Sequence, residues 1–152
     1  MSSSLENDLV RVEYSSDAWT ILWPKSPAAV RGLALDASPT GARDGFSFIT
    51  RARLVPGQPS VLFSVIARND TAARLTLPGL ALSSDAVTLG RDAEPSVYVD
   101  SGSQGGTHIA PLGDGQTCAG ICALYNAVAD LGLVCAFVSF EHDNKVRVAP
   151  RD

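Results

Sequence analysis

The sequence predicts a mainly β protein. We expect a single-domain antiparallel β-sandwich, with a jelly-roll-like arrangement as one alternative, and one helix late in the chain at about residues 117–131. Three observations support this fold class. Apolar and polar residues alternate with period 2 in many short segments, as in half-buried strands. These segments recur at roughly 8–12-residue spacing, separated by turn-forming residues. The chain also lacks the repeating βα pattern of a parallel sheet.

The chain length of 152 residues fits one domain, residues 1–152. A chain of this size buries roughly two thirds of its unfolded surface without the help of metals or disulfides. Residues 1–8 are polar and slightly acidic, a composition compatible with a disordered N-terminus.

Strand-like segments fill the first half of the sequence. The predicted strands are Leu9–Tyr14, Ala18–Trp23, a short one near Val30–Leu35, Phe46–Val55 and Ser60–Arg68. Between the last two, Pro56-Gly57-Gln58-Pro59 predicts a turn, because proline fixes φ and glycine permits positive φ.

The second half continues with shorter segments. They are Leu75–Leu82, Val87–Leu89, Ser96–Val99, Thr107–Ile109, Leu133–Phe140 and Lys145–Ala149. Pro78 interrupts the first of these, which therefore belongs at an edge or a bulge, because proline cannot donate to a ladder.

The late helix is predicted from a different period. Its apolar residues at helical spacing are Cys118, Ile121, Cys122, Tyr125 and Val128. Thr117 suits the N-cap of such a helix, and Gly132 suits its end. Residues 118–129 are also compatible with a strand of small residues.

Composition favours self-association over nucleic-acid or membrane binding. Only 18% of the residues are charged, and the net charge is −4 with no basic cluster that could track phosphates. The longest apolar run is too short for a membrane span, and no secretory signal opens the chain. Its 3 cysteines indicate a reducing compartment. We expect a soluble protein that is intracellular or part of a particle assembled inside the cell.

The stretch GQTCAGICALYNAVADLGL resembles the helix of papain-like cysteine peptidases, which carry a cysteine at the head of a helix that packs on a sheet. The resemblance implies that Cys118 is a nucleophile. A helix N-terminus would also lower the pKa of this thiol. His142 would be the base, oriented by Asp143 or Asn144. In that family, however, the base follows after a much longer stretch.

The cysteines admit two other interpretations. Cys118, Cys122, Cys135 and His142 together form a chemically legitimate zinc set, although their spacing differs from the usual C-x2-C knuckle. Free cysteines are also among the most frequently buried residues, so the three thiols are first expected to be core residues. No metal or cofactor is expected.

Other polar candidates are more weakly indicated. His108 and the loop carboxylates are interpreted as solvated; the carboxylates are Asp85, Asp92, Glu94, Asp100 and Asp114. Gly113-Asp114-Gly115 is too short for a phosphate loop. Asn69-Asp70-Thr71 matches a glycosylation sequon, which matters only in a secreted chain.

Trp19 and Trp23 lie on the same face of the predicted strand. If the two rings are exposed, they form a platform on which carbohydrate can stack. If they are buried, they belong to the core.

We therefore expect a non-enzymatic, self-assembling sandwich subunit, such as a coat or decoration protein. A lectin-like module using Trp19 and Trp23 is the alternative binding function. A small cysteine hydrolase using Cys118 and His142 is the enzymatic alternative.

Overall fold

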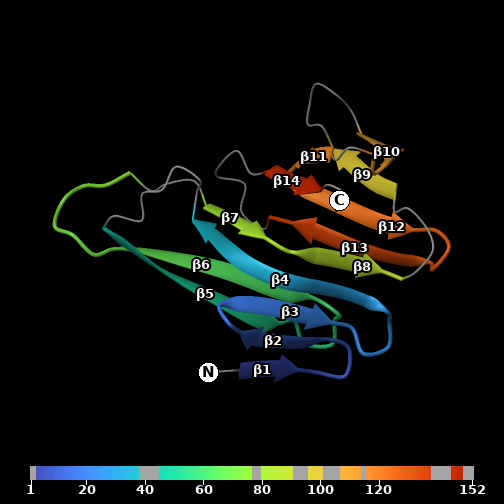
Figure 1. The fold of residues 1–152 in the computed structure, drawn as a ribbon, viewed down its shortest axis with the longest axis horizontal. Coiled ribbons are helices and arrows are strands. Elements are labelled where there is room, and N and C mark those ends of the chain that lie inside the picture. The colour runs from blue at the N-terminus through green and yellow to red at the C-terminus, as the bar shows by residue number, and fades with distance from the viewer. Residues whose placement is uncertain are drawn as a thin grey trace. The chain divides into compact units, whose positions relative to one another are not determined.

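The computed structural model describes residues 3–37, 45–76, 80–90, 96–100, 107–113, 116–137 and 145–148. In these ranges the chain forms antiparallel sheets, which confirms the predicted mainly β class (Figure 1). The chain divides into two compact units, residues 1–87 and 88–152. No helix in these ranges has the length and apolar character that a membrane crossing requires.

Eight of the described strands begin within unit 1, and the last of them, β8, ends just beyond it. They are β1 (Ser3–Glu6), β2 (Arg11–Ser15), β3 (Ala18–Leu22), β4 (Ala28–Ala37), β5 (Phe46–Leu54), β6 (Val61–Asn69), β7 (Leu80–Ser83) and β8 (Ala86–Leu89). One sheet has the order β1-β2-β3-β4-β7, with β8 also pairing with β4, and β5 and β6 form a separate hairpin. Strand β1 was not predicted, and β4 is longer than the short strand expected near Val30–Leu35.

Turn chemistry follows the sequence closely. Between β5 and β6, the Gln58 amide donates to the Val55 carbonyl at 3.2 Å, and Gly57 has a φ of 68°. Pro56 followed by a residue with positive φ is the signature of a type II turn, which confirms the predicted turn. Between β2 and β3, Ser16 and Asp17 both adopt positive φ, as in a two-residue type I′ hairpin.

The core of unit 1 is built around Trp19. Its side chain is only 9% exposed, and its ring lies 4.5 Å from the Tyr14 ring and 5.8 Å from the Phe63 ring, centroid to centroid. Phe63 belongs to β6, so this contact packs the hairpin on the sheet. The Trp23 Nε1–H adds a hydrogen bond of 2.9 Å to the Pro59 carbonyl in the hairpin turn.

Unit 2 is formed by the C-terminal strands. They are β9 (Ser96–Asp100), β10 (Thr107–Pro111), β11 (Gln116–Ala119), β12 (Ile121–Asn126), β13 (Leu131–Ala136) and β14 (Lys145–Val148). A four-stranded sheet has the order β10-β9-β12-β13, and β11 pairs with β14. Strand β12 therefore lies inside its sheet, paired on both edges.

The helix predicted at about residues 117–131 is wrong. These residues form β11, β12 and the start of β13, and Gly120 separates the first two with a φ of 78°. A right-handed helix cannot continue through this conformation. Ladder hydrogen bonds on both sides of β12 then outweigh the weak helical preference of its small residues.

Trp19 provides a test of the core of unit 1. We expect Trp19→Ala to lower the free energy of unfolding by about 3–5 kcal/mol, because it empties a large buried site. We expect Trp19→Phe to cost clearly less. The indole Nε1 is buried with no hydrogen-bond partner among the described residues, so its removal relieves a desolvation cost of about 1–3 kcal/mol. Urea unfolding followed by circular dichroism measures both variants, and equal losses would contradict this account.

Candidate functional site

The three cysteines lie on three strands of unit 2 and are all free thiols. Cys118 on β11 is 0% exposed and Cys122 on β12 is 2% exposed, whereas Cys135 on β13 is exposed. Cys122 and Cys135 are directly opposite each other in the β12–β13 ladder. Cys118 is thus a fully buried strand residue and does not begin a helix, so the helix dipole invoked to activate it is missing.

The electrostatics of the cluster disfavour thiolates. Burial, together with the charge and a hydrogen bond of the neighbouring Cys118 thiol, raises the pKa of Cys122 to about 12. Although Cys135 reaches the surface, desolvation by the atoms packed around its thiol also raises its pKa. Nucleophilic attack and metal binding both need the deprotonated form. At neutral pH the thiolate forms of Cys122 and Cys135 are therefore disfavoured, which makes both residues weak nucleophiles.

Several predicted partners of these thiols cannot be placed. His142 and Asp143 lie outside the described residues, as does Asn144. Within the described ranges, no three His, Cys, Asp or Glu residues are grouped so that they could hold a metal ion.

The remaining polar candidates are scattered. His108 is an exposed residue of β10, Asp85 precedes β8, and Asp100 ends β9. Asp92, Glu94 and Asp114 lie outside the described residues.

The two tryptophans do not form an exposed platform. Trp19 is buried against Tyr14 and Phe63, and Trp23 is half-buried with its Nε1–H engaged by Pro59. In this conformation Trp19 belongs to the core, the alternative that the sequence left open.

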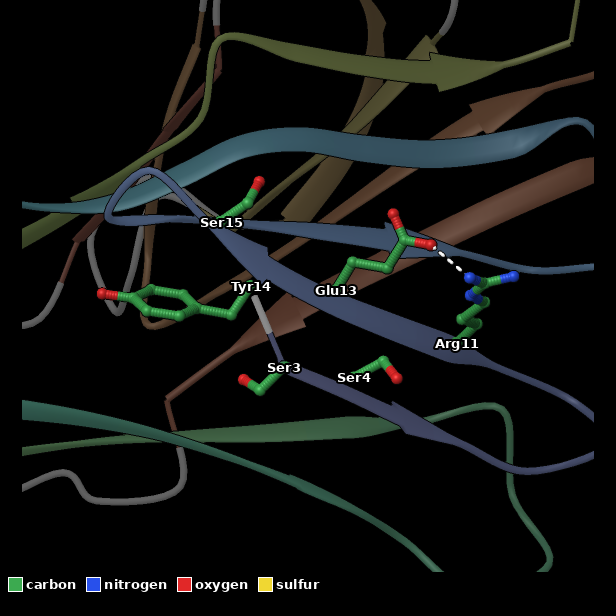
Figure 2. A pocket seen from close by; sticks show the side chains of 6 residues that line it. All are labelled: Ser3, Ser4, Arg11, Glu13, Tyr14 and Ser15. Carbon is green, nitrogen blue, oxygen red and sulfur yellow. Dashed lines mark ion pairs between the residues drawn. The ribbon is translucent and has the colours of Figure 1, made fainter. Parts of the chain in front are cut away.

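A shallow hollow of about 320 Å³ lies over the N-terminal hairpin (Figure 2). Its lining residues are Ser3, Ser4, Arg11, Glu13, Tyr14 and Ser15. The guanidinium of Arg11 is already paired with Glu13 at 2.7 Å, and the Tyr14 hydroxyl donates to Asp17 at 3.0 Å. This hydrogen bond raises the pKa of Tyr14. The charges of the hollow thus neutralise each other and favour neither an anion nor a cation.

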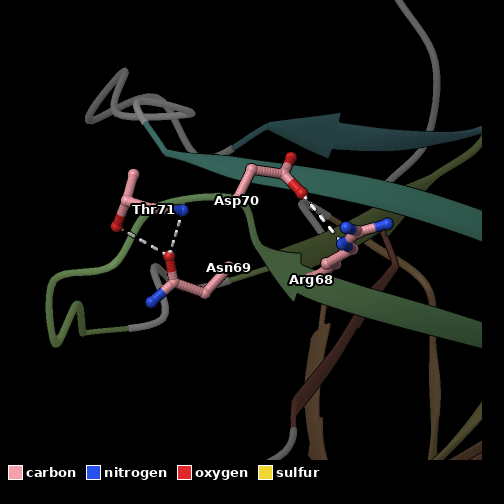
Figure 3. Close-up of polar contacts among 4 residues, drawn as sticks. All are labelled: Arg68, Asn69, Asp70 and Thr71. Atoms are coloured by element: carbon pink, nitrogen blue, oxygen red, sulfur yellow. Dashed lines mark hydrogen bonds and ion pairs between the residues drawn. The ribbon is translucent and has the colours of Figure 1, made fainter.

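The sequon at residues 69–71 forms a tight turn after β6 (Figure 3). The Asn69 Oδ1 accepts hydrogen bonds from the amide and hydroxyl of Thr71, at 2.9 and 2.8 Å. Its Nδ2 donates to the Ala73 carbonyl at 2.8 Å, and Arg68 pairs with Asp70 at 3.2 Å. Both polar atoms of the Asn69 side chain therefore make hydrogen bonds that stabilise the turn.

A buried counterpart of this turn follows β12. Asn126 is 2% exposed; its Oδ1 accepts from the amides of Val128 and Ala129, and its Nδ2 donates to the Leu89 carbonyl at 2.9 Å. Asn126 thereby closes the β12–β13 turn and ties it to the end of β8. Sequence reasoning missed this residue because its importance depends on burial.

An apolar surface covers one face of the four-stranded sheet. The ladder registers place Ile109, Tyr98, Ala123 and Val134 in a single cross-strand row. Directly opposite residues share a face of an antiparallel sheet. Ile121 and Tyr125 flank Ala123 on the same face of β12, because side chains alternate along a strand. We call the surface of Ile109, Ile121, Ala123, Tyr125, Val134 and Ala136 the outer face.

The outer face is exposed although its residues are apolar. Ile109 is 75% exposed and Val134 is 64% exposed, and Ile121 and Tyr125 are exposed as well. The opposite face of β12 carries the buried residues Cys122, Leu124 and Asn126. A contiguous exposed apolar surface of this kind commonly marks an interaction site.

Comparison of the chain with protein-family models, curated proteins and solved structures finds no match. The outer face was not predicted, because residues 117–131 were assigned to a helix. The signal was present: Ile121, Ala123 and Tyr125 alternate with three residues that are buried. A strand assignment for this segment would have revealed the surface.

Asn126 and Asn69 form a matched pair for a stability test. We expect Asn126→Ala to lower the free energy of unfolding by about 2–3 kcal/mol, because it leaves the buried Leu89 carbonyl without this donor. Asn69→Ala removes similar contacts at an exposed turn and should cost about 1 kcal/mol or less. Urea unfolding measures both losses. Equal losses would show that burial does not determine the role of Asn126.

The thiol cluster provides a test of reactivity. Because burial raises the pKa of Cys122 to about 12, the native protein holds almost none of its thiolate at about pH 8.5. We expect iodoacetamide to modify exposed Cys135 first and Cys122 at least about tenfold more slowly. The rate at Cys122 should rise with pH toward its pKa.

Peptide mass spectrometry locates the modified cysteine. The same protein in denaturant is the control, in which the cysteines should react at similar rates. Fast modification of native Cys122 at neutral pH would contradict the raised pKa.

Proposed function

We propose that the protein is a non-enzymatic subunit that assembles with copies of itself through the outer face of unit 2. A coat, decoration or similar particle protein is the concrete form of this function. The observation that carries the proposal is the row of exposed apolar residues across the sheet, with Ile109 75% exposed and Val134 64% exposed.

Apolar burial makes this surface suitable for association. Covering apolar area stabilises a complex by roughly 25 cal/mol per Å² before the costs of association. None of the six residues of the outer face is charged, and the Tyr125 hydroxyl donates a hydrogen bond of 3.0 Å to the Asp130 carboxylate. An uncharged surface suits the centre of an interface. The low fraction of charged residues, 18%, also favours association.

We further propose that the sheets form a sandwich, with a jelly-roll-like arrangement as one form. Strand β12 has one buried and one exposed face, the pattern of a sheet that covers a core. The packing of the β5–β6 hairpin on the sheet of unit 1 through Trp19 is a second two-layered contact.

The alternative functions are less well supported by the side chains. A cysteine hydrolase needs an accessible thiolate, whereas Cys118 is fully buried. A lectin built on two exposed indole rings would need Trp19 at the surface, and that residue is 9% exposed.

Static light scattering after size-exclusion chromatography tests the assembly. We expect the wild-type chain to be larger than one protomer and Ile109→Lys to shift it toward the monomer, because the substitution places a charge in the outer face. Val128→Lys is the matched control. Val128 is 73% exposed but lies in the β12–β13 turn, outside the outer face. A wild-type monomer at all concentrations would refute the proposal.

A further inference from the structure

Strand β13 lies at the end of its four-stranded sheet as the described residues form it. It pairs with β12 on one side, and no described strand pairs with its other side. Gly132, Val134, Cys135 and Ala136 are exposed in this strand. An open edge presents unpaired amides and carbonyls to which another strand can bind.

The ladder shows which backbone groups point outward. The Phe137 amide donates to the Gly120 carbonyl at 2.9 Å, in line with the β12–β13 register. Hydrogen-bonded and non-hydrogen-bonded pairs alternate along an antiparallel ladder. Cys135 and Leu133 therefore bond inward to β12, and the amides and carbonyls of Gly132, Val134 and Ala136 face outward.

The composition of β13 does nothing to protect this edge. Proteins usually protect edges with charge, proline or very short strands. β13 contains six residues, Leu-Gly-Leu-Val-Cys-Ala, and none of them is charged or proline. By contrast, β10 at the other end of the sheet ends with Pro111, β5 carries Arg51 and Arg53, and β7 contains only four residues.

We propose that β13 pairs antiparallel with β13 of a second copy, with Val134 of one copy directly opposite Val134 of the other. This register also places Gly132 opposite Ala136, so all three outward-facing residues of each strand find a partner. A shift by two residues leaves at least one of them unpaired. The inference rests on the proposed function and adds a second contact, the β13 edge, to the one proposed for the outer face.

A second copy fits this edge better than an unrelated peptide. The outward groups are symmetric about Val134, so the strand is complementary to itself under a two-fold axis perpendicular to the sheet. That axis keeps the outer faces of both copies on the same side. The row of Ile109, Ala123 and Val134 then continues into the second copy as one larger apolar surface.

A symmetric cross-link tests the register. Directly opposite residues of a hydrogen-bonded antiparallel pair have Cα atoms about 5.5 Å apart, within the range of a disulfide. In a Cys135→Ala background, we expect Val134→Cys to form a disulfide-linked dimer under mild oxidation with oxidised glutathione. Non-reducing electrophoresis detects the dimer.

The matched control is Ala123→Cys in the same background. Ala123 shares the cross-strand row but lies one strand further from the two-fold axis, with Cα atoms roughly 14 Å apart in the proposed dimer. It should remain uncross-linked. Equal cross-linking of both variants, or no cross-linking at Val134→Cys, would overturn the inference.

A proline variant tests the same edge without oxidation. Because the Val134 amide faces outward, Val134→Pro removes no bond to β12 and is tolerated as edge prolines are. It should raise the dissociation constant of the dimer by about tenfold or more, through loss of the two bonds exchanged at the axis. An unchanged dissociation constant in a variant with a native circular dichroism spectrum would count against the pairing.

Light scattering on the wild-type chain separates the two proposals. A wild-type oligomer together with a failed cross-link at Val134→Cys would refute the β13 contact and leave self-assembly standing. A wild-type monomer would refute both.

Discussion

The pairing of β12 on both of its edges determines the character of unit 2. With β9 on one side and β13 on the other, the strand cannot rotate or slip without breaking two ladders. Every second side chain is therefore fixed on one face. Cys122, Leu124 and Asn126 become core residues, and the residues between them form a surface.

This constraint places the thiols and the exposed apolar residues of β12 and β13 mainly on opposite faces of the sheet. The sulfur atoms of unit 2 lie mainly on the buried side of the sheet, where burial disfavours the charged thiolate. The exposed side of β12 carries Ile121, Ala123 and Tyr125, and of these only Tyr125 has a polar side-chain group, a hydroxyl that donates to Asp130. In the proposed assembly, copies of the chain contact each other through apolar area, and the edge strand β13 sets the direction in which a neighbour is added.

Much of the fold could be predicted from the sequence where a local signal existed. Alternation located β5 and β6, and Pro56-Gly57 located their turn, because these features depend on neighbouring residues alone. Strand β1 gave no apolar signal since all of its residues are exposed. The helix at residues 117–131 was predicted because Cys118, Ile121, Cys122, Tyr125 and Val128 recur at helical spacing. Ladders made by distant strands cannot be read locally. The outer face was missed for the same reason. The burial of Trp19 was one of two alternatives that only tertiary packing could decide.

The two units carry different natural probes. Both tryptophans, Trp19 and Trp23, belong to residues 1–87, and all three cysteines belong to residues 88–152. Tryptophan fluorescence, excited selectively, consequently reports on the first unit alone, and thiol labelling reports on the second alone. The native sequence can therefore reveal whether its two units unfold together or in sequence, without any substitution to introduce a probe.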